Sequence, residues 1–168
     1  LMANGQWLTA KNMRNPYFNT PPVVQNLIIA NCVFYLAVRL IPAVNHFCAE
    51  YLQLWWTDAF NAPEFHSYQF VTYMFLHAGF GHLFSNMFAL WMFGRTLEYE
   101  LGSQRFLTYY MVCGIGAALI QIGVASLFGE NLTLLGASGA VFGLLLAFGV
   151  LHPNNMIYII PLPFPIKA

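Results

Sequence analysis

The sequence predicts an all-α fold, a polytopic bundle of membrane helices, and three observations support this class. Hydrophobic residues make up 59% of the 168 residues and charged residues only 7%, whereas an ordinary soluble domain has about 25% charged residues. Four long apolar stretches alternate with polar connections. Apart from Arg39, lysine and arginine lie in or beside alternate connections, as expected of a chain that crosses a membrane repeatedly. The length suits one domain, so we expect residues 1–168 to form a single membrane domain.

The four apolar stretches predict four transmembrane helices. They are residues 23–41, 81–97, 106–128 and 136–151. About 20 helical residues are needed to cross about 30 Å of hydrocarbon, so the last stretch is short for a complete crossing. A short helix that begins below the membrane surface would hold its first residues in a cavity lined by protein. Asn26 and Asn31 in the first span are expected to face other helices, where amides find partners.

The positive charges of the connections indicate how the chain is oriented. They are Lys11, Arg14, Arg95, Arg105 and Lys167. The connections at residues 42–78 and 129–135 contain no lysine or arginine. The positive-inside rule therefore predicts that residues 1–22 form a cytoplasmic tail. Residues 42–78 are rich in tryptophan and tyrosine, which favour the membrane–water interface, so we expect an interfacial first loop there.

Charge and residue spacing also argue against several classes of function. The net charge is zero, so no nucleic-acid partner is expected. The three cysteines are far apart and lack the spacing of a metal or redox site. His77, His82 and Asn86 offer no carboxylate or thiolate, and no HExxH motif is present. We therefore expect no metal and no other cofactor.

A serine between small residues marks the start of the last apolar stretch. Residues 136–139 read Gly-Ala-Ser-Gly, and glycine beside a serine lets a substrate approach the backbone closely. The first N–H groups of a helix have no partner within the helix and could meet a developing oxyanion. Ser138 is therefore a candidate nucleophile. The structural alternative is a close helix contact, since Gly139 and Gly143 form a GxxxG motif.

Two polar side chains share one face at the start of the second span. His82 and Asn86 are four residues apart, which places them on the same side of a helix. Polar groups within a membrane helix are costly unless they have a role. That role is either a structural hydrogen bond or chemistry. The predicted orientation places both side chains on the same outer side of the membrane as Ser138, which favours a shared site.

Three linked motifs resemble those of the rhomboid intramembrane serine proteases. The motifs are His77 to Asn86 (HAGFGHLFSN), Gly94-x-x-x-Glu98-x-x-x-Gly102, and Gly136 to Gly143 (GASGAVFG). The resemblance covers residues 69–151, with the motifs in the order and at the spacing of the family. Glu98 in the second motif is expected either to pair with a neighbouring arginine or to cap backbone N–H groups.

The resemblance implies a six-helix core in which a serine–histidine dyad hydrolyses transmembrane protein substrates in the lipid bilayer. Ser138 matches the nucleophile. His82 and Asn86 match the pair whose side chains help to hold the oxyanion, and Gly136 belongs to the loop that shapes the same hole. Phe142 matches a position where the family has an aromatic ring against the catalytic histidine. We expect a multi-pass protein of the bacterial plasma (inner) membrane.

One part of the family pattern has no counterpart in residues 1–168. The general base of the family is a histidine on the sixth helix, and only four of the six expected helices are found here. His152 would lie about 21 Å along the helix from Ser138, beyond hydrogen-bond reach. We therefore expect a fragment without the fifth and sixth helices. Residues 1–168 alone are expected to be inactive, because an unassisted serine hydroxyl is a weak nucleophile.

Two alternatives to a protease remain open at this point. A rhomboid-like pseudoprotease would bind transmembrane helices without cleaving them, and the missing base favours it. The joint presence of Ser138, His82 and Asn86 argues against it. A small transporter or channel subunit would require more ionisable residues within the membrane than His82 and Arg39.

Overall fold

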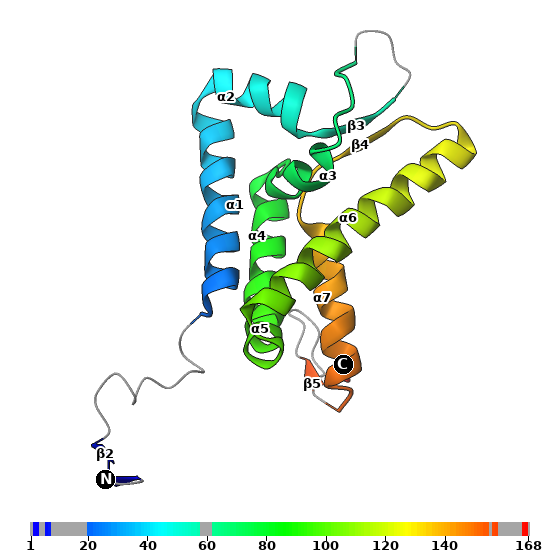
Figure 1. The fold of residues 1–168 in the computed structure, drawn as a ribbon. Helices are drawn as coiled ribbons and strands as arrows, with labels where there is room; N and C mark the ends of the chain where they lie inside the picture. Colours follow the sequence, from blue (N-terminus) through cyan, green and yellow to red (C-terminus); the bar gives the residue numbers. More distant parts are fainter. Residues whose placement is uncertain are drawn as a thin grey trace.

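The computed structural model describes residues 20–57 and 62–154, and the backbone of four two-residue strands at 2–3, 6–7, 156–157 and 166–167. Four helical segments form the body of the protein (Figure 1). They are α1 (Pro22–Leu40), the run of α4 (Phe80–Ala89), η4 (Leu90–Gly94) and α5 (Arg95–Leu101), then α6 (Ser103–Phe128), and α7 (Ser138–Leu151). The predicted all-α class is confirmed, and the strands are short additions to it.

Two of the described helices are long and apolar enough to cross a membrane. These are α1, with a mean hydropathy of 1.7, and α6, with a mean hydropathy of 2.0. The α7 helix is shorter, at 14 residues, and a turn of π-helix at η4 interrupts the second segment. Length and composition thus support two of the four predicted spans, and the total of four stays a prediction.

The outer surface of the bundle is strongly apolar. Phe80, Phe84 and Phe88 lie on one face of α4 with 68%, 59% and 47% of their surface exposed. Their rings follow one another at centroid separations of 6.0 Å. Soluble proteins rarely expose contiguous apolar surface on this scale. Such a surface is stable in lipid, which agrees with the membrane assignment.

The described parts of the predicted first loop, residues 42–57 and 62–78, form a structured cap over one end of the bundle (Figure 1). Its elements are α2 (Pro42–Phe47), η2 (Cys48–Leu52), β3 (Leu54–Trp56), α3 (Gln69–Thr72) and η3 (Tyr73–Phe75). Strand β3 pairs antiparallel with β4 (Leu132–Leu134), and Leu54 lies opposite Leu134. The cap is thereby joined to the segment that leads into α7. The interfacial position of this loop stays a prediction.

Gln69 holds the cap together from its centre. Its side chain is completely buried. The amide nitrogen donates to the carbonyls of Tyr51 and Glu64, and the amide oxygen accepts from the backbone N–H groups of Trp55 and His66. One side chain therefore satisfies backbone groups that irregular structure leaves open, as burial of polar backbone requires.

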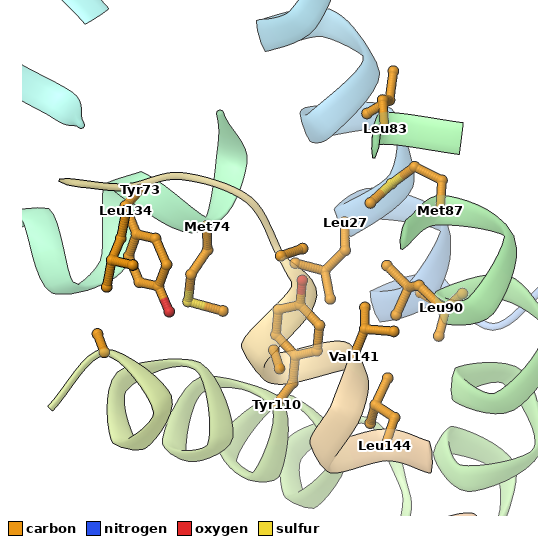
Figure 2. Packing of buried hydrophobic residues seen from close by; sticks show 14 of the residues in the cluster. Leu27, Tyr73, Met74, Leu83, Met87, Leu90, Tyr110, Leu134, Val141 and Leu144 are labelled. Carbon is orange, nitrogen blue, oxygen red and sulfur yellow. The ribbon is translucent and has the colours of Figure 1, made fainter. Parts of the chain in front are cut away.

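The core lies where the helices meet below this cap. Figure 2 shows Tyr110 of α6 close to Val141 and Leu144 of α7, with Leu27 of α1 and Leu90 of η4 in the same cluster. These side chains are at most 7% exposed. A core shared by residues from all parts of the chain fixes α7, and with it Ser138, relative to the other helices.

The α7 helix approaches α6 at small residues. A Cβ atom added at Gly139 would lie 2.5 Å from Cβ of Ala117, and one added at Gly143 would overlap the side chain of Cys113. The hydroxyl of Tyr109 donates to the Gly143 carbonyl at 2.8 Å. The GxxxG contact considered from sequence is therefore present, and it brings the backbone of the Ser138 segment close to α6.

Glu98 caps the first helix from a distant part of the chain. Its carboxylate accepts hydrogen bonds from the backbone N–H groups of Val23 and Val24 at 3.0 and 2.8 Å and from the Ser103 hydroxyl at 2.6 Å. Pro21 precedes the first turn and supplies no side-chain cap. Glu98 is 2% exposed. Of the two roles considered for Glu98, the structure shows the backbone cap.

Other expectations for the first span and the tail have mixed outcomes. Asn31 is fully buried and donates to the Leu27 carbonyl at 2.7 Å. Asn26 is exposed, so the expectation that it faces other helices is wrong. Its position on α1 turns it away from the face that packs on the bundle. Most of the predicted cytoplasmic tail, residues 1–22, lies outside the described residues.

Replacement of Glu98 by glutamine is expected to lower the free energy of unfolding by about 2 kcal/mol. The amide keeps the shape of the side chain but loses the charge, and hydrogen bonds to charged groups contribute about 1.5–3 kcal/mol each. The loss also removes a negative charge from a helix N-terminus. Unfolding in mixed micelles, followed by circular dichroism, measures the difference.

Glu130→Gln is the matched control, because Glu130 is exposed and its replacement should change stability by less than about 0.5 kcal/mol. Equal stabilities of the two variants would contradict the assigned role of Glu98.

Candidate active site

The segment before α7 is held in a conformation that requires glycine. Gly136 has a φ angle of +111°, a region that other residues rarely adopt. Its backbone N–H donates to the Tyr73 carbonyl at 2.9 Å. Ala137 follows as the N-cap, and α7 starts at Ser138. The half-buried serine therefore occupies the first position of a helix.

His82 lies directly against Gly136. A Cβ atom added at Gly136 would be 2.5 Å from Cε1 and 2.7 Å from Nε2 of His82. The histidine ring thus packs on the backbone two residues before Ser138. The sequence placed both positions on the same side of the membrane, and the structure brings this histidine to the serine loop.

Asn86 lies one helical turn below His82. It is 5% exposed, and its side-chain nitrogen donates to the backbone carbonyl of His82 at 3.0 Å. An amide nitrogen carries two hydrogens, so the second one remains for another acceptor. Both residues belong to α4, so this hydrogen bond joins a side chain to the backbone of its own helix. It does not join two helices.

The start of α7 can stabilise negative charge. The first N–H groups of a helix have no partner within it, and among the described side chains none caps this end. A helix N-terminus also carries partial positive charge. The His82 ring lies beside the same loop, against Gly136. Backbone N–H donors and an imidazole are groups of the kind that can stabilise an oxyanion.

The buried His77 side chain packs against the ring of His82. Its ring centroid is 5.0 Å from that of His82, in an edge-to-face arrangement, and the residue is 6% exposed. Burial, with a smaller contribution from neighbouring His82, lowers the pKa of His77 to about 4. The Phe75 carbonyl offsets part of this shift without reaching hydrogen-bond geometry. His77 is therefore neutral at physiological pH.

Tyr73 is the residue of this site that the sequence did not single out. Its carbonyl accepts from the Gly136 N–H, and its buried hydroxyl donates to the Gly114 carbonyl of α6 at 2.8 Å. It thereby fixes the serine loop to the cap and to a neighbouring helix. Tyr73 is one of many aromatic residues in this region of the sequence, so no local signal distinguishes it.

The remaining predicted positions lie apart from the serine. Phe142 is 69% exposed, so its ring faces the surface rather than a histidine of the described residues. His152 follows the far end of α7, where Nε2 lies 3.1 Å from Oε1 of Glu100. His46 is in the cap and pairs with Glu50. No other histidine of the described residues is placed to act as a base for Ser138 in the way the sixth-helix histidine is expected to.

Metal ligands do not cluster in the part of the chain that the structure describes. No group of three or more histidine, cysteine, aspartate or glutamate side chains is placed there to hold a metal ion. The chemistry available at the site is that of a hydroxyl, imidazole and amide groups and backbone N–H donors.

Fold and site together define a class: a helical membrane protein with a serine at the start of a helix and a histidine packed on the loop just before it. The Rhomboid domain family matches residues 64–168, which is more than half of the chain. This chain belongs to the rhomboid family.

Three named relatives show how far the similarity extends. Rhomboid-like protein 11, chloroplastic, of Arabidopsis thaliana is 46% identical over 46% of this chain and 26% of its own length. Rhomboid protein 1, mitochondrial, of Saccharomyces cerevisiae is 39% identical over 54% of this chain and 27% of its own. The Bacillus subtilis protein named "Putative rhomboid protease YdcA" is 32% identical over 74% of this chain and 70% of its own.

The chain spans about a quarter of the length of the first two relatives. The relatives include chloroplastic, mitochondrial and bacterial proteins. They establish a rhomboid membrane protein, and they give no support to the bacterial plasma membrane over an organellar one.

Replacement of Gly136 by alanine is expected to displace the His82 ring. The new methyl group would overlap the ring, and the positive φ angle would add backbone strain of about 1–3 kcal/mol. Nitrogen and carbon chemical shifts of His82 in isotope-labelled protein report the displacement. Gly79→Ala is the control, since Gly79 has an extended backbone and open space around its Cβ position. Unchanged His82 shifts in Gly136→Ala would contradict the packing described here.

Stability is expected to fall as the pH is lowered from about 6.5 to about 4, in part because of His77. The pKa of His77 is lowered in the folded protein, so the unfolded chain binds a proton in this range and the folded protein does not. The cost at pH 4 is up to about 3 kcal/mol, since each pKa unit corresponds to about 1.4 kcal/mol. Above pH 7 the effect is absent.

Thermal unfolding at pH 7 and pH 4.5 measures this effect. His77→Gln should lose less stability on acidification than the unmodified protein, whereas His46→Gln, at an exposed position, should behave like the unmodified protein. If His77→Gln loses as much stability on acidification as the unmodified protein, groups other than His77 cause that loss.

Proposed function

We propose that this chain carries the nucleophile and oxyanion-binding elements of an intramembrane serine endopeptidase. Its substrates are transmembrane proteins, cleaved within or near the lipid bilayer. The observation that carries the proposal is the packing of His82 on Gly136, two residues before Ser138. Membership of the rhomboid family supports the same reading.

The proposed reaction begins with attack of the Ser138 hydroxyl on the carbonyl carbon of a substrate peptide bond. The hydroxyl proton passes to a general base, and the carbonyl oxygen becomes an oxyanion. Backbone N–H groups at the start of α7 and the side chains of His82 and Asn86 donate to this oxygen. Loss of one such donor lowers kcat by about 10²–10³-fold in serine proteases.

The intermediate then collapses to an acyl-enzyme on Ser138. The C–N bond breaks, and the leaving amine takes the proton from the base. Water hydrolyses the ester and restores the serine hydroxyl. The resemblance assigns the base to a histidine on a sixth helix, which has no counterpart in residues 1–168. We propose that this histidine is contributed from outside these residues.

The proposed orientation places the site toward the side of the membrane opposite the positively charged connections. His82 lies in the first turn of α4 and Ser138 begins α7, and both helices run from there toward the end of the bundle where α5 and the start of α6 lie (Figure 1). Arg95 and Arg105 belong to that second end. The positive-inside rule then favours a cytoplasmic N-terminus.

The second candidate is a pseudoprotease that binds transmembrane helices without cleaving them. The exposed face of α7 offers a surface for such binding. Phe142, Leu146 and Val150 are 69%, 67% and 70% exposed and form a stripe of apolar side chains along the helix. A substrate helix or another part of the protein could pack on this stripe in either candidate.

A fluorophosphonate probe, which reacts with activated serines, is expected to label the full-length gene product at Ser138. Labelling should be lost in Ser138→Ala, because the probe has no other activated hydroxyl, and retained in Ser85→Ala. Ser85 is an exposed serine of α4 and serves as the matched control. Residues 1–168 alone should label at least 10²-fold more slowly, since the base is absent.

Labelling that persists in Ser138→Ala would contradict the assignment of the nucleophile. A folded full-length protein that is not labelled but forms crosslinks with a transmembrane peptide would support the pseudoprotease instead.

A further inference from the structure

An open cavity lies between the cap and the end of α6, at the end of the bundle where β3 and β4 pair (Figure 1). Its volume is about 600 Å³, and its walls come from residues 55–57 and 62–65 of the cap, the last turn of α6 and residues 129–131. Ser138 and the residues around it do not line this cavity. Its size is typical of a site for a small molecule or a lipid headgroup.

Aromatic rings form one part of the lining. Trp55, Trp56 and Phe65 border the cavity, and the rings of Trp56 and Phe65 stand nearly perpendicular, with an interplanar angle of 81°. The indole N–H of Trp56 donates to the Ser126 hydroxyl at 3.0 Å, and that of Trp55 donates to the Ala49 carbonyl at 2.7 Å. With their N–H groups bonded, the indoles offer a ligand mainly their ring surfaces, which attract cations.

Two carboxylates add negative charge to the same cavity. Glu64 and Glu130 line it, and both are exposed. Among the described residues, neither is part of an ion pair. Residues 42–78 and 129–135, which supply most of the lining, contain no lysine or arginine. The cavity therefore attracts a cation and repels an anion.

An apolar face of α6 leads away from the cavity. Leu119 and Val112 precede Ser126 by seven and fourteen residues, which places all three on one side of the helix. Leu119 and Val112 are 53% and 62% exposed. A cationic pocket at the end of an apolar helix face suits an amphiphile, whose charged head and hydrocarbon chain need these two environments together.

We infer that this cavity binds the ammonium headgroup of a zwitterionic phospholipid, with an acyl chain along the Leu119 face of α6. The aromatic rings and the carboxylates hold the ammonium group, and the bound lipid joins the cap to the end of α6. A basic side chain of a protein partner would satisfy the charge but would leave the apolar face unused. The inference does not depend on the proposed protease activity.

Fluorine NMR of the full-length protein labelled with fluorotryptophan, in maltoside micelles, tests the inference without an assay of activity. The probe is dihexanoyl phosphatidylcholine. Dihexanoyl phosphatidylglycerol is its control, because it keeps the phosphate and the chains but has no ammonium group. The signals of Trp55 and Trp56, identified by replacement with phenylalanine, are expected to shift and saturate with phosphatidylcholine only. Trp91, which does not line the cavity, should respond equally to both lipids.

Variants of the carboxylates provide the second measurement. Glu64→Gln and Glu130→Gln should each weaken the apparent affinity for phosphatidylcholine about two- to fivefold, the range expected for one exposed charge pair. Glu50→Gln is the matched control, since Glu50 belongs to the cap but does not line this cavity, and it should leave the affinity unchanged. Unchanged affinity in both folded cavity variants would contradict the role of the carboxylates.

The comparison of the two lipids decides the inference even if a variant fails to fold. Equal responses of Trp55 and Trp56 to phosphatidylcholine and phosphatidylglycerol would overturn it. A saturable response to a transmembrane peptide flanked by lysine, without one to phosphatidylcholine, would overturn the lipid assignment in favour of a protein partner.

Discussion

The carboxylate of Glu98 is the interaction on which the arrangement of helices depends. It bonds the first free N–H groups of α1, which would otherwise have no partner within the helix. Its negative charge also complements the partial positive charge of the helix N-terminus. Because Glu98 belongs to α5, its hydrogen bonds fix one end of α1 to the second helical segment. The first helix then runs alongside α4 toward the site (Figure 1).

The opposite end of α1 completes this frame. Arg39, near the end of the helix, donates to the carbonyl of Ala78, the residue between His77 and the start of α4. Tyr73 adds bonds to Gly136 and Gly114. The elements around Ser138 are thus held from three sides, by α1, by the cap and by α6. Ser138, the proposed nucleophile, would need such support, because small displacements of catalytic groups reduce rate strongly.

Several buried polar side chains of the described residues bond to the backbone, whereas the ring nitrogens of His77 and the hydroxyl of Tyr110 have no partner there. Gln69 bonds to backbone groups that irregular structure leaves open, and Glu98 bonds to N–H groups at a helix N-terminus. Asn31 donates to a backbone carbonyl one helical turn away. His77 is as deeply buried and has no such partner among the described groups. The contact of His77 with the site is instead its ring packing against His82, whose ring lies on Gly136.

The sequence by itself determined the membrane class and the candidate residues, because composition and the HxxxN and GxSG spacings are local properties of the chain. It also limited Glu98 to two roles. Only the tertiary structure decided between these two roles and brought His82 against Gly136, since these contacts join segments more than fifty residues apart. It also showed that Asn26 faces outward. The cap formed by β3 and β4 and the part played by Tyr73 were likewise decided there. Backbone hydrogen bonds between distant segments carry no side-chain pattern that a sequence can reveal.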